Sequence, residues 1–140
     1  MGCALLEITE SGGDWSVKKL WKNRNMQCKF TSPAYFQGHV YGLHNNHLVC
    51  LDAQTGERKW TGSEYGNGQL LLLADQDLLL VSSEEGELAL VGATPDQFRE
   101  LARFPAIEGK TWNHPVLAGD VLLVRNGEEM AAFRLSLADR

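Results

Sequence analysis

The chain has 140 residues, of which 44% are hydrophobic, and its formal net charge at pH 7 is -5. This length suits one domain with a substantial core, and the apolar share excludes an intrinsically disordered chain. The acidic balance disfavours nonspecific nucleic-acid binding, and the longest apolar run, residues 70–74, is too short to span a membrane. The three cysteines are widely spaced and odd in number, which fits neither a disulfide framework nor a zinc site.

Short runs of apolar, β-branched and aromatic residues, separated by turn-forming residues, predict an all-β chain. In chain order, the expected strands cover residues 4–8, 16–21, 30–36, 39–43, 48–51, 70–73, 78–81, 88–91, 98–104, 114–117, 121–124 and 130–135, with a further strand that begins at residue 58. Asn45-Asn46 and Asn126-Gly127 each predict a tight hairpin, because Asn and Gly tolerate the left-handed backbone of such turns.

The strand pattern repeats with a period near 40 residues. Trp21 and Trp60 are 39 residues apart, and Val40 and Leu78 are 38 residues apart. Four strands per unit at this period are the signature of a β-propeller built of four-stranded antiparallel blades. Stacked blades bury both faces of a sheet, which explains apolar runs without clean alternation. A β-sandwich is the rival structural interpretation, since it also combines short strands with frequent turns.

The offsets divide the chain into a half blade, two full blades and a three-stranded partial blade. These units cover residues 1–29, 30–67, 68–110 and 111–140. Phe104 is the expected counterpart of Trp60 in the third unit, because it lies 44 residues further on. The propeller is therefore expected to be partial or to be closed by strand exchange.

Incomplete blades expose sheet edges, and exposed edges invite pairing. Three arrangements stay open. The last unit accepts the Trp21 strand within one chain and closes a four-bladed ring, or two chains exchange that strand and close an eight-bladed ring, or the chain is a fragment of a longer protein. We expect the isolated chain to self-associate through its open blade edges as a homodimer.

Residues 50–60, CLDAQTGERKW, resemble the repeat of the pyrroloquinoline-quinone-type (PQQ-like) β-propeller family. The family motif reads Ala, any residue, Asp, two of any residue, Thr-Gly, three of any residue, Trp. The matching positions are Asp52, Thr55, Gly56 and Trp60. Cys50 replaces the usual Ala. The resemblance implies that Trp60, and Trp21 in the preceding unit, dock between adjacent blades, and that the Asp and Thr hold the turn.

The same family includes quinone-dependent dehydrogenases and a noncatalytic branch typified by the outer-membrane assembly lipoprotein BamB. The dehydrogenases carry an adjacent cysteine pair near their cofactor, and this sequence has no such pair. The resemblance therefore implies a noncatalytic scaffold that binds a protein or a ligand without a cofactor. A fragment of a PQQ- and calcium-dependent dehydrogenase is the first alternative, and a sugar- or peptide-binding sensor module is the second.

Few residues are candidates for chemistry. Trp112, Asn113 and His114 lie at the entry of a predicted inner strand, where loops line the mouth of a propeller, and they form a candidate ligand patch. Packing between blades is the alternative role for these three residues. His44 and His47 flank a predicted turn, but two histidines make an incomplete metal site, so we interpret them as a solvated hairpin tip. No metal site and no catalytic residue is expected.

Residues 1–6 lack the basic segment and the long apolar segment of a signal peptide. The sequence as given is expected in the cytoplasm, whereas a longer protein with a signal peptide would be periplasmic or secreted. The expected partner is another protein or a second copy of the chain, with no nucleic acid and no membrane span.

Overall fold

The computed structural model describes residues 2–135, and in this range the chain is all-β and antiparallel, which confirms the predicted fold class at that level. The strands are β1 (Cys3–Ser11), β2 (Asp14–Asn23), β3 (Ala34–Phe36), β4 (His39–His44), β5 (His47–Asp52), β6 (Arg58–Glu64), β7 (Gln69–Leu73), β8 (Leu78–Ser82), β9 (Glu87–Gly92), β10 (Glu100–Pro105), β11 (Val116–Ala118), β12 (Val121–Arg125) and β13 (Met130–Arg134). A short 3-10 turn, η1 (Ala74–Gln76), follows β7.

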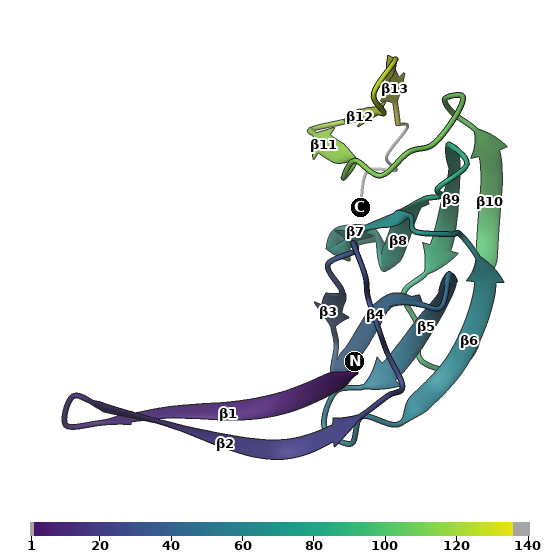
Figure 1. Ribbon diagram of the computed structural model, residues 1–140. Helices are drawn as coiled ribbons and strands as arrows, with labels where there is room; N and C mark the ends of the chain where they lie inside the picture. The colour runs from purple at the N-terminus through teal and green to yellow at the C-terminus, as the bar shows by residue number, and fades with distance from the viewer. Residues whose placement is uncertain (1, 136–140) are drawn as a thin grey trace.

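The strands form four separate sheets. Within each sheet, every strand pairs with its neighbours in chain order. The first sheet is β1-β2, the second is β3-β4-β5-β6, the third is β7-β8-β9-β10, and the fourth is β11-β12-β13. Figure 1 shows β3, β7 and β11 along the concave side of an arc, with β6 and β10 along its convex side. Strand β2, which carries Trp21, pairs with β1 and not with β13, so the exchange of that strand within one chain does not occur here.

Two hairpins illustrate how local sequence sets the register. Asn45 and Asn46 have φ values of 47° and 72°, which gives the two-residue turn expected between β4 and β5. The hairpin expected at Asn126-Gly127 has instead a four-residue loop, residues 126–129, between β12 and β13. The Asn126 side chain explains the longer loop, because its Oδ1 accepts hydrogen bonds from the backbone N–H groups of Glu128 and Glu129, each at 2.9 Å.

Most strand boundaries differ from the prediction by one or two residues, and β1 and β2 are longer than predicted, but two of the differences have a clear physical reason. Strand β3 is confined to Ala34–Phe36, because Pro33 has no N–H to donate to a sheet ladder. Strand β10 begins at Glu100, whereas the prediction began at Phe98. The Phe98 ring instead packs against the Trp60 ring of the second sheet, with 5.6 Å between ring centroids.

Hydrophobic clusters lie between successive sheets. The cluster between the second and third sheets contains Tyr41, Leu43, Leu48, Cys50, Trp60, Leu70, Leu79, Val81, Ala89 and Val91. The cluster between the third and fourth sheets contains Leu73, Leu80, Leu88, Ile107, Leu122 and Val124. A third cluster, of Met26, Val49 and Leu51 with Cys3 packed against it, lies on the other side of the second sheet. The second and third sheets therefore bury both faces, which accounts for their continuous apolar runs.

We call the face that a sheet turns toward the following sheet its leading face, and the opposite face its trailing face. Tyr41, Cys50 and Trp60 lie on the leading face of the second sheet, against the third sheet. No helix within residues 2–135 is long and apolar enough to cross a membrane.

Candidate functional site

Trp60 joins the second sheet to the third. Its side chain, in β6, is only 9% exposed, and its Nε1 donates a hydrogen bond to the carbonyl oxygen of Thr94 at 2.8 Å. The ring lies between Tyr41 and Phe98, with centroid distances of 5.9 and 5.6 Å. The indole thus fills the space between two sheets while its polar atom stays paired, as a buried Trp requires.

Trp21 makes the same kind of connection one unit earlier. Its Nε1, in β2, donates to the carbonyl oxygen of Ala53 at 3.1 Å, so it binds the turn between β5 and β6. The ring lies directly on Gly56, where an added Cβ would come within 2.8 Å of a ring carbon. Gly56 also has a φ of 71°, a backbone conformation that favours glycine. The positive φ and the closeness of the Trp21 ring are thus two separate reasons for a glycine at this position. Trp21 is half-buried, whereas Trp60 is buried.

The Asp and Thr of the predicted docking motif shape the turn that receives Trp21. Oδ1 of Asp52 accepts hydrogen bonds from the backbone N–H groups of Thr55 and Gln54, both at 2.9 Å. These bonds, first the one from Thr55, hold the pKa of the Asp52 carboxyl below its usual value. The Thr55 hydroxyl accepts from the N–H of Glu57 at 3.2 Å. The four motif residues thus form one turn and one inter-sheet connection.

The registers identify which residue occupies the Trp60 position in the third sheet. Trp60 is opposite Cys50 in the register, next to a bulge, and Trp21 is opposite Leu5 at an equivalent bulge. In the third sheet the bulge places Ala102 opposite Leu90. The assignment of Phe104 as the counterpart of Trp60 is therefore wrong.

Phe104 provides a different contact between sheets. It lies two residues beyond the Trp60 position and contacts Phe133 of the fourth sheet, with 5.6 Å between the ring centroids. An aromatic ring still connects the third and fourth sheets, but from another position on the outer strand.

Two exposed aromatic rings meet where the loop that leads into β11 approaches the loop that leads into β3. Trp112 is 52% exposed and Phe30 is 66% exposed, and their ring centroids are 6.3 Å apart with 31° between the planes. The Lys110 ammonium lies 5.6 Å from the Trp112 ring centroid. We call Phe30, Glu84, Lys110 and Trp112 the Trp112 patch. Exposed aromatic clusters of this kind mark binding surfaces more often than exposed single rings do.

Hydrogen bonds with Glu84 and Gln69 hold the Trp112 patch in place. Glu84 accepts hydrogen bonds from Trp112 Nε1 at 3.0 Å and from the backbone N–H of Asn67 at 2.9 Å. These bonds, the one from Asn67 first, lower the pKa of the Glu84 carboxyl, which therefore stays ionised at neutral pH. The buried Gln69 side chain donates to the carbonyl oxygens of Trp112 and Phe30, at 2.9 and 3.3 Å. The Trp112 ring is thus positioned without a ligand, and the backbone that carries Phe30 is fixed beside it.

Of the three residues predicted for a ligand patch, only Trp112 belongs to this aromatic surface. His114 has its Nε2 3.0 Å from the carbonyl oxygen of Leu70 and its Nδ1 2.7 Å from that of Pro115, so both ring nitrogens lie at backbone acceptors. Asn113 is partly buried. The contribution of Phe30 was missed, because nothing in a single sequence places it beside a residue so far away along the chain.

His44 and His47 face one another across the β4–β5 turn. Nδ1 of His47 lies 2.9 Å from the carbonyl oxygen of Asn45, and Nε2 of His44 lies 3.2 Å from the Asn45 side-chain nitrogen. Burial, with Arg58 and His47 nearby, lowers the pKa of His44, so this imidazole is neutral near pH 7. Within the part of the chain that is described, no group of three or more His, Cys, Asp or Glu side chains is arranged to hold a metal ion.

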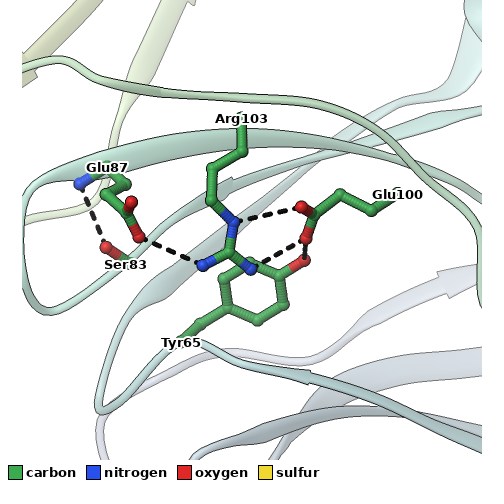
Figure 2. Close-up of polar contacts among 5 residues, drawn as sticks. All are labelled: Tyr65, Ser83, Glu87, Glu100 and Arg103. Carbon is green, nitrogen blue, oxygen red and sulfur yellow. Dashed lines mark hydrogen bonds and ion pairs between the residues drawn. The ribbon is translucent and has the colours of Figure 1, made fainter.

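A cluster of ionisable groups joins the end of the second sheet to the third (Figure 2). Arg103 donates to Glu100 at 3.1 and 2.8 Å and to Glu87 at 3.1 Å, and its guanidinium lies 4.6 Å from the Tyr65 ring centroid. The buried Tyr65 hydroxyl donates to Glu100, and burial followed by this bond raises the pKa of Tyr65. Opposite charges are paired inside the cluster, and its contacts join the residue that follows β6 to strands β9 and β10.

Comparison with protein-family models finds none that matches this chain, and comparison with curated proteins finds no match either. The class of the molecule is thus defined by its geometry: an all-β chain whose antiparallel sheets follow one another with apolar clusters between them.

Proposed function

We propose that the chain is a noncatalytic scaffold of the PQQ-like β-propeller type, with a protein-binding site at the Trp112 patch. The propeller assignment is supported by the recurring connection between sheets. Trp21 and Trp60 each donate Nε1 to a carbonyl oxygen in a turn of the next sheet, at Ala53 and at Thr94. A two-layered sandwich does not account for a third sheet that is covered on both faces by other sheets.

The single observation that carries the binding site is the exposed pair of Phe30 and Trp112 rings, of which the Trp112 ring is preoriented. Aromatic side chains supply large contact areas at low entropic cost, and they are enriched among the residues that dominate binding energy. Because Glu84 and Gln69 already fix Trp112, binding does not have to order this ring.

The surroundings of the patch indicate the chemistry of the partner. A hollow of about 330 Å³ lies beside it, and its lining includes Glu64, Glu84 and Glu85, together with Glu87, whose charge is already paired with Arg103. Glu84 is shared between this hollow and the patch. A partner segment with an apolar side chain for the rings and a Lys or Arg for the acidic hollow fits both features. We therefore expect a basic peptide segment as the bound element.

The noncatalytic assignment rests on how the ionisable groups are used. Glu84 holds a loop and an indole, His114 contacts two backbone carbonyls, and the Tyr65–Arg103 cluster pairs its own charges. The Tyr65 hydroxyl does donate to a carboxylate, that of Glu100, but this carboxylate is ion-paired with Arg103 and is therefore a weak base for general acid–base or covalent catalysis.

A displayed library of short random peptides tests the proposal. Selection on the wild-type chain is expected to yield Lys- or Arg-containing peptides with an aromatic or aliphatic residue. Calorimetry with one selected peptide then compares wild type with Trp112→Ala, which should weaken binding at least about tenfold, as expected for an interface hot spot. Tyr35→Ala, which removes a similarly exposed aromatic outside the patch, should leave the affinity within about twofold. Peptides that bind Trp112→Ala as tightly as wild type would refute the proposed site.

A further inference from the structure

The two sheets at the ends of the described range each leave one apolar face uncovered. On the first sheet, Ile8 is paired with Val17 and Glu10 with Trp15, and these side chains share the trailing face with Leu6. Ile8, Val17 and Trp15 are 61%, 63% and 73% exposed. We call Leu6, Ile8, Trp15 and Val17 the hairpin face. The opposite side of the same strands is polar, with Glu7, Thr9, Ser16 and Lys18, so the apolar residues are segregated rather than scattered.

Comparison with the second sheet shows that this hairpin is an extended form of a shorter one. Strands β5 and β6 and strands β1 and β2 share the same bulge beside their Trp, since Cys50 is opposite Trp60 as Leu5 is opposite Trp21. The β5–β6 hairpin turns soon afterwards, at Asp52. The β1–β2 hairpin continues to Ser11 and Asp14 and projects away from the other sheets (Figure 1). The extension carries three of the four hairpin-face residues.

The fourth sheet has the complementary surface. Val116 is opposite Leu123, Leu123 is opposite Ala132, and Met130 is opposite Arg125, so these residues lie on the leading face of β11-β12-β13. Met130 is 67% exposed, and Val116 is also exposed. We call Val116, Leu123, Met130 and Ala132 the fourth-sheet face. A hollow of about 140 Å³ lies among Val116, Leu123 and Met130 and offers a recess for a large side chain.

Elsewhere in the described part of the chain, a leading face is always packed against the trailing face of the following sheet. The leading face of the second sheet is covered by the trailing face of the third, and the leading face of the third sheet is covered by the trailing face of the fourth. The two remaining faces are a trailing one, on the first sheet, and a leading one, on the fourth. They are therefore of the two kinds that pack together elsewhere in the same molecule.

Sheet edges do not identify a partner in this way. Strands β6 and β10 are outer edges of well-packed sheets, and β1 and β13 are edges as well. Because every sheet here has free edges, an open edge does not distinguish the first and fourth sheets from the others. The uncovered apolar faces do distinguish them.

We propose that two copies of the chain associate head to tail, with the hairpin face of one copy packed on the fourth-sheet face of the other. Such an interface is heterologous, so it builds a ring when its rotation closes and a longer series when it does not. The inference rests on the stacking of the sheets and not on the Trp112 patch, so either proposal can fail without the other.

Analytical ultracentrifugation of two surface variants tests the inference. Ile8→Glu/Val17→Glu places charges on the hairpin face, and Val116→Glu/Met130→Glu places them on the fourth-sheet face. Wild type at about 100 µM is expected to sediment as a dimer or larger species that dissociates on dilution, whereas each variant alone stays monomeric. Thr9→Glu/Ser16→Glu, on the polar side of the hairpin, is the matched control and should associate like wild type.

Mixing the two variants tests whether the hairpin face of one copy packs on the fourth-sheet face of another. Each retains one intact face, so an equimolar mixture should form a dimer and nothing larger, which also shows that both variants are folded. A monomeric wild type at about 100 µM would overturn the proposal. So would a Val116→Glu/Met130→Glu variant that still associates alone, because that result indicates contact between two hairpins. A mixture that stays monomeric, with both variants folded by circular dichroism, would overturn it as well.

Discussion

The β5–β6 and β1–β2 hairpins begin alike and end in different environments. Each carries a Trp beside a bulge, and each Trp donates Nε1 to a carbonyl oxygen of the next sheet. Trp60 is buried between Tyr41 of the second sheet and Phe98 of the loop before β10, whereas Trp21 is half-buried on the surface of a turn. The comparison teaches that a shared local motif fixes the direction of a side chain, while the neighbouring sheet decides how much stability the motif contributes.

Replacing the two tryptophans tests this difference most strongly. Trp60→Ala should lower the free energy of unfolding by about 3–5 kcal/mol, because it empties a packed interior site and removes the partner of the Thr94 carbonyl. Trp21→Ala should cost only about 1–2 kcal/mol, because part of its ring is already in water. Urea unfolding followed by circular dichroism measures both values. Equal losses would show that the two connections contribute alike and would contradict the comparison.

A glycine substitution in each hairpin separates backbone strain from contact. Gly56 and Gly12 both have positive φ, 71° and 63°. Gly56→Ala should destabilise by at least about 2 kcal/mol, because the new Cβ also collides with the Trp21 ring. Gly12→Ala has open space around the new Cβ and should cost about 1 kcal/mol, the backbone effect alone. The new Cβ would also collide with Asn23 Nδ2, so the difference between the two urea midpoints should narrow but not vanish in the Trp21→Ala background. A difference that stays the same there would rule out the contact with the ring.

Part of this difference between the hairpins could be predicted from the sequence. The motif from Asp52 to Trp60 and the turn at Asn45-Asn46 are local signals, and the side-chain chemistry of each is complete within a few residues. The extension of β1 and β2 was underestimated, because an alternating strand looks the same whether or not another sheet covers it.

Two other features depend on long-range geometry. A bulge shifts the register so that Ala102 takes the Trp60 position and Phe104 does not, and a bulge leaves no clear mark in composition. Phe30 reaches Trp112 only because the loops before β3 and β11 converge, so the sequence indicated one member of the Trp112 patch and not its partner.

The stability that the Tyr65–Arg103 cluster contributes should depend on pH, whereas that of the exposed β1–β2 hairpin should not. The hydrogen bonds from Arg103, with that from Tyr65, hold the pKa of Glu100 below its usual value. The unfolded chain therefore binds this proton more readily, so the stabilisation is complete above about pH 4.5 and is lost as the pH falls through the folded pKa. Glu100→Gln should lower the free energy of unfolding by about 1–1.5 kcal/mol at pH 7, as measured by urea unfolding. The difference in free energy of unfolding between this variant and wild type should become smaller at pH 3.

The control for that experiment is Glu7→Gln on the exposed hairpin. Glu7 has only a 3.8 Å pair with Lys18, and both side chains are largely exposed. Exposed pairs of this kind contribute little, so the urea midpoint of Glu7→Gln should follow wild type at every pH. If the free energy of unfolding of Glu100→Gln differs from that of wild type by the same amount at pH 7 and at pH 3, the cluster does not stabilise the fold through the charge of Glu100.

The smallest expected effect concerns the apolar residues of the hairpin face. Val17→Thr changes an exposed methyl to a hydroxyl and should alter the free energy of unfolding by less than about 0.5 kcal/mol. Val49→Thr makes the same change at a fully buried strand position and should cost about 1–3 kcal/mol. The comparison has to be made at low micromolar concentration, where the copies are dissociated. At about 100 µM, Val17→Thr should become destabilising in the same assay, because association then stabilises wild type more than the variant. A Val17→Thr penalty that does not change with concentration would mean that the hairpin face is satisfied within a single chain, and head-to-tail packing would then have no surface left to explain.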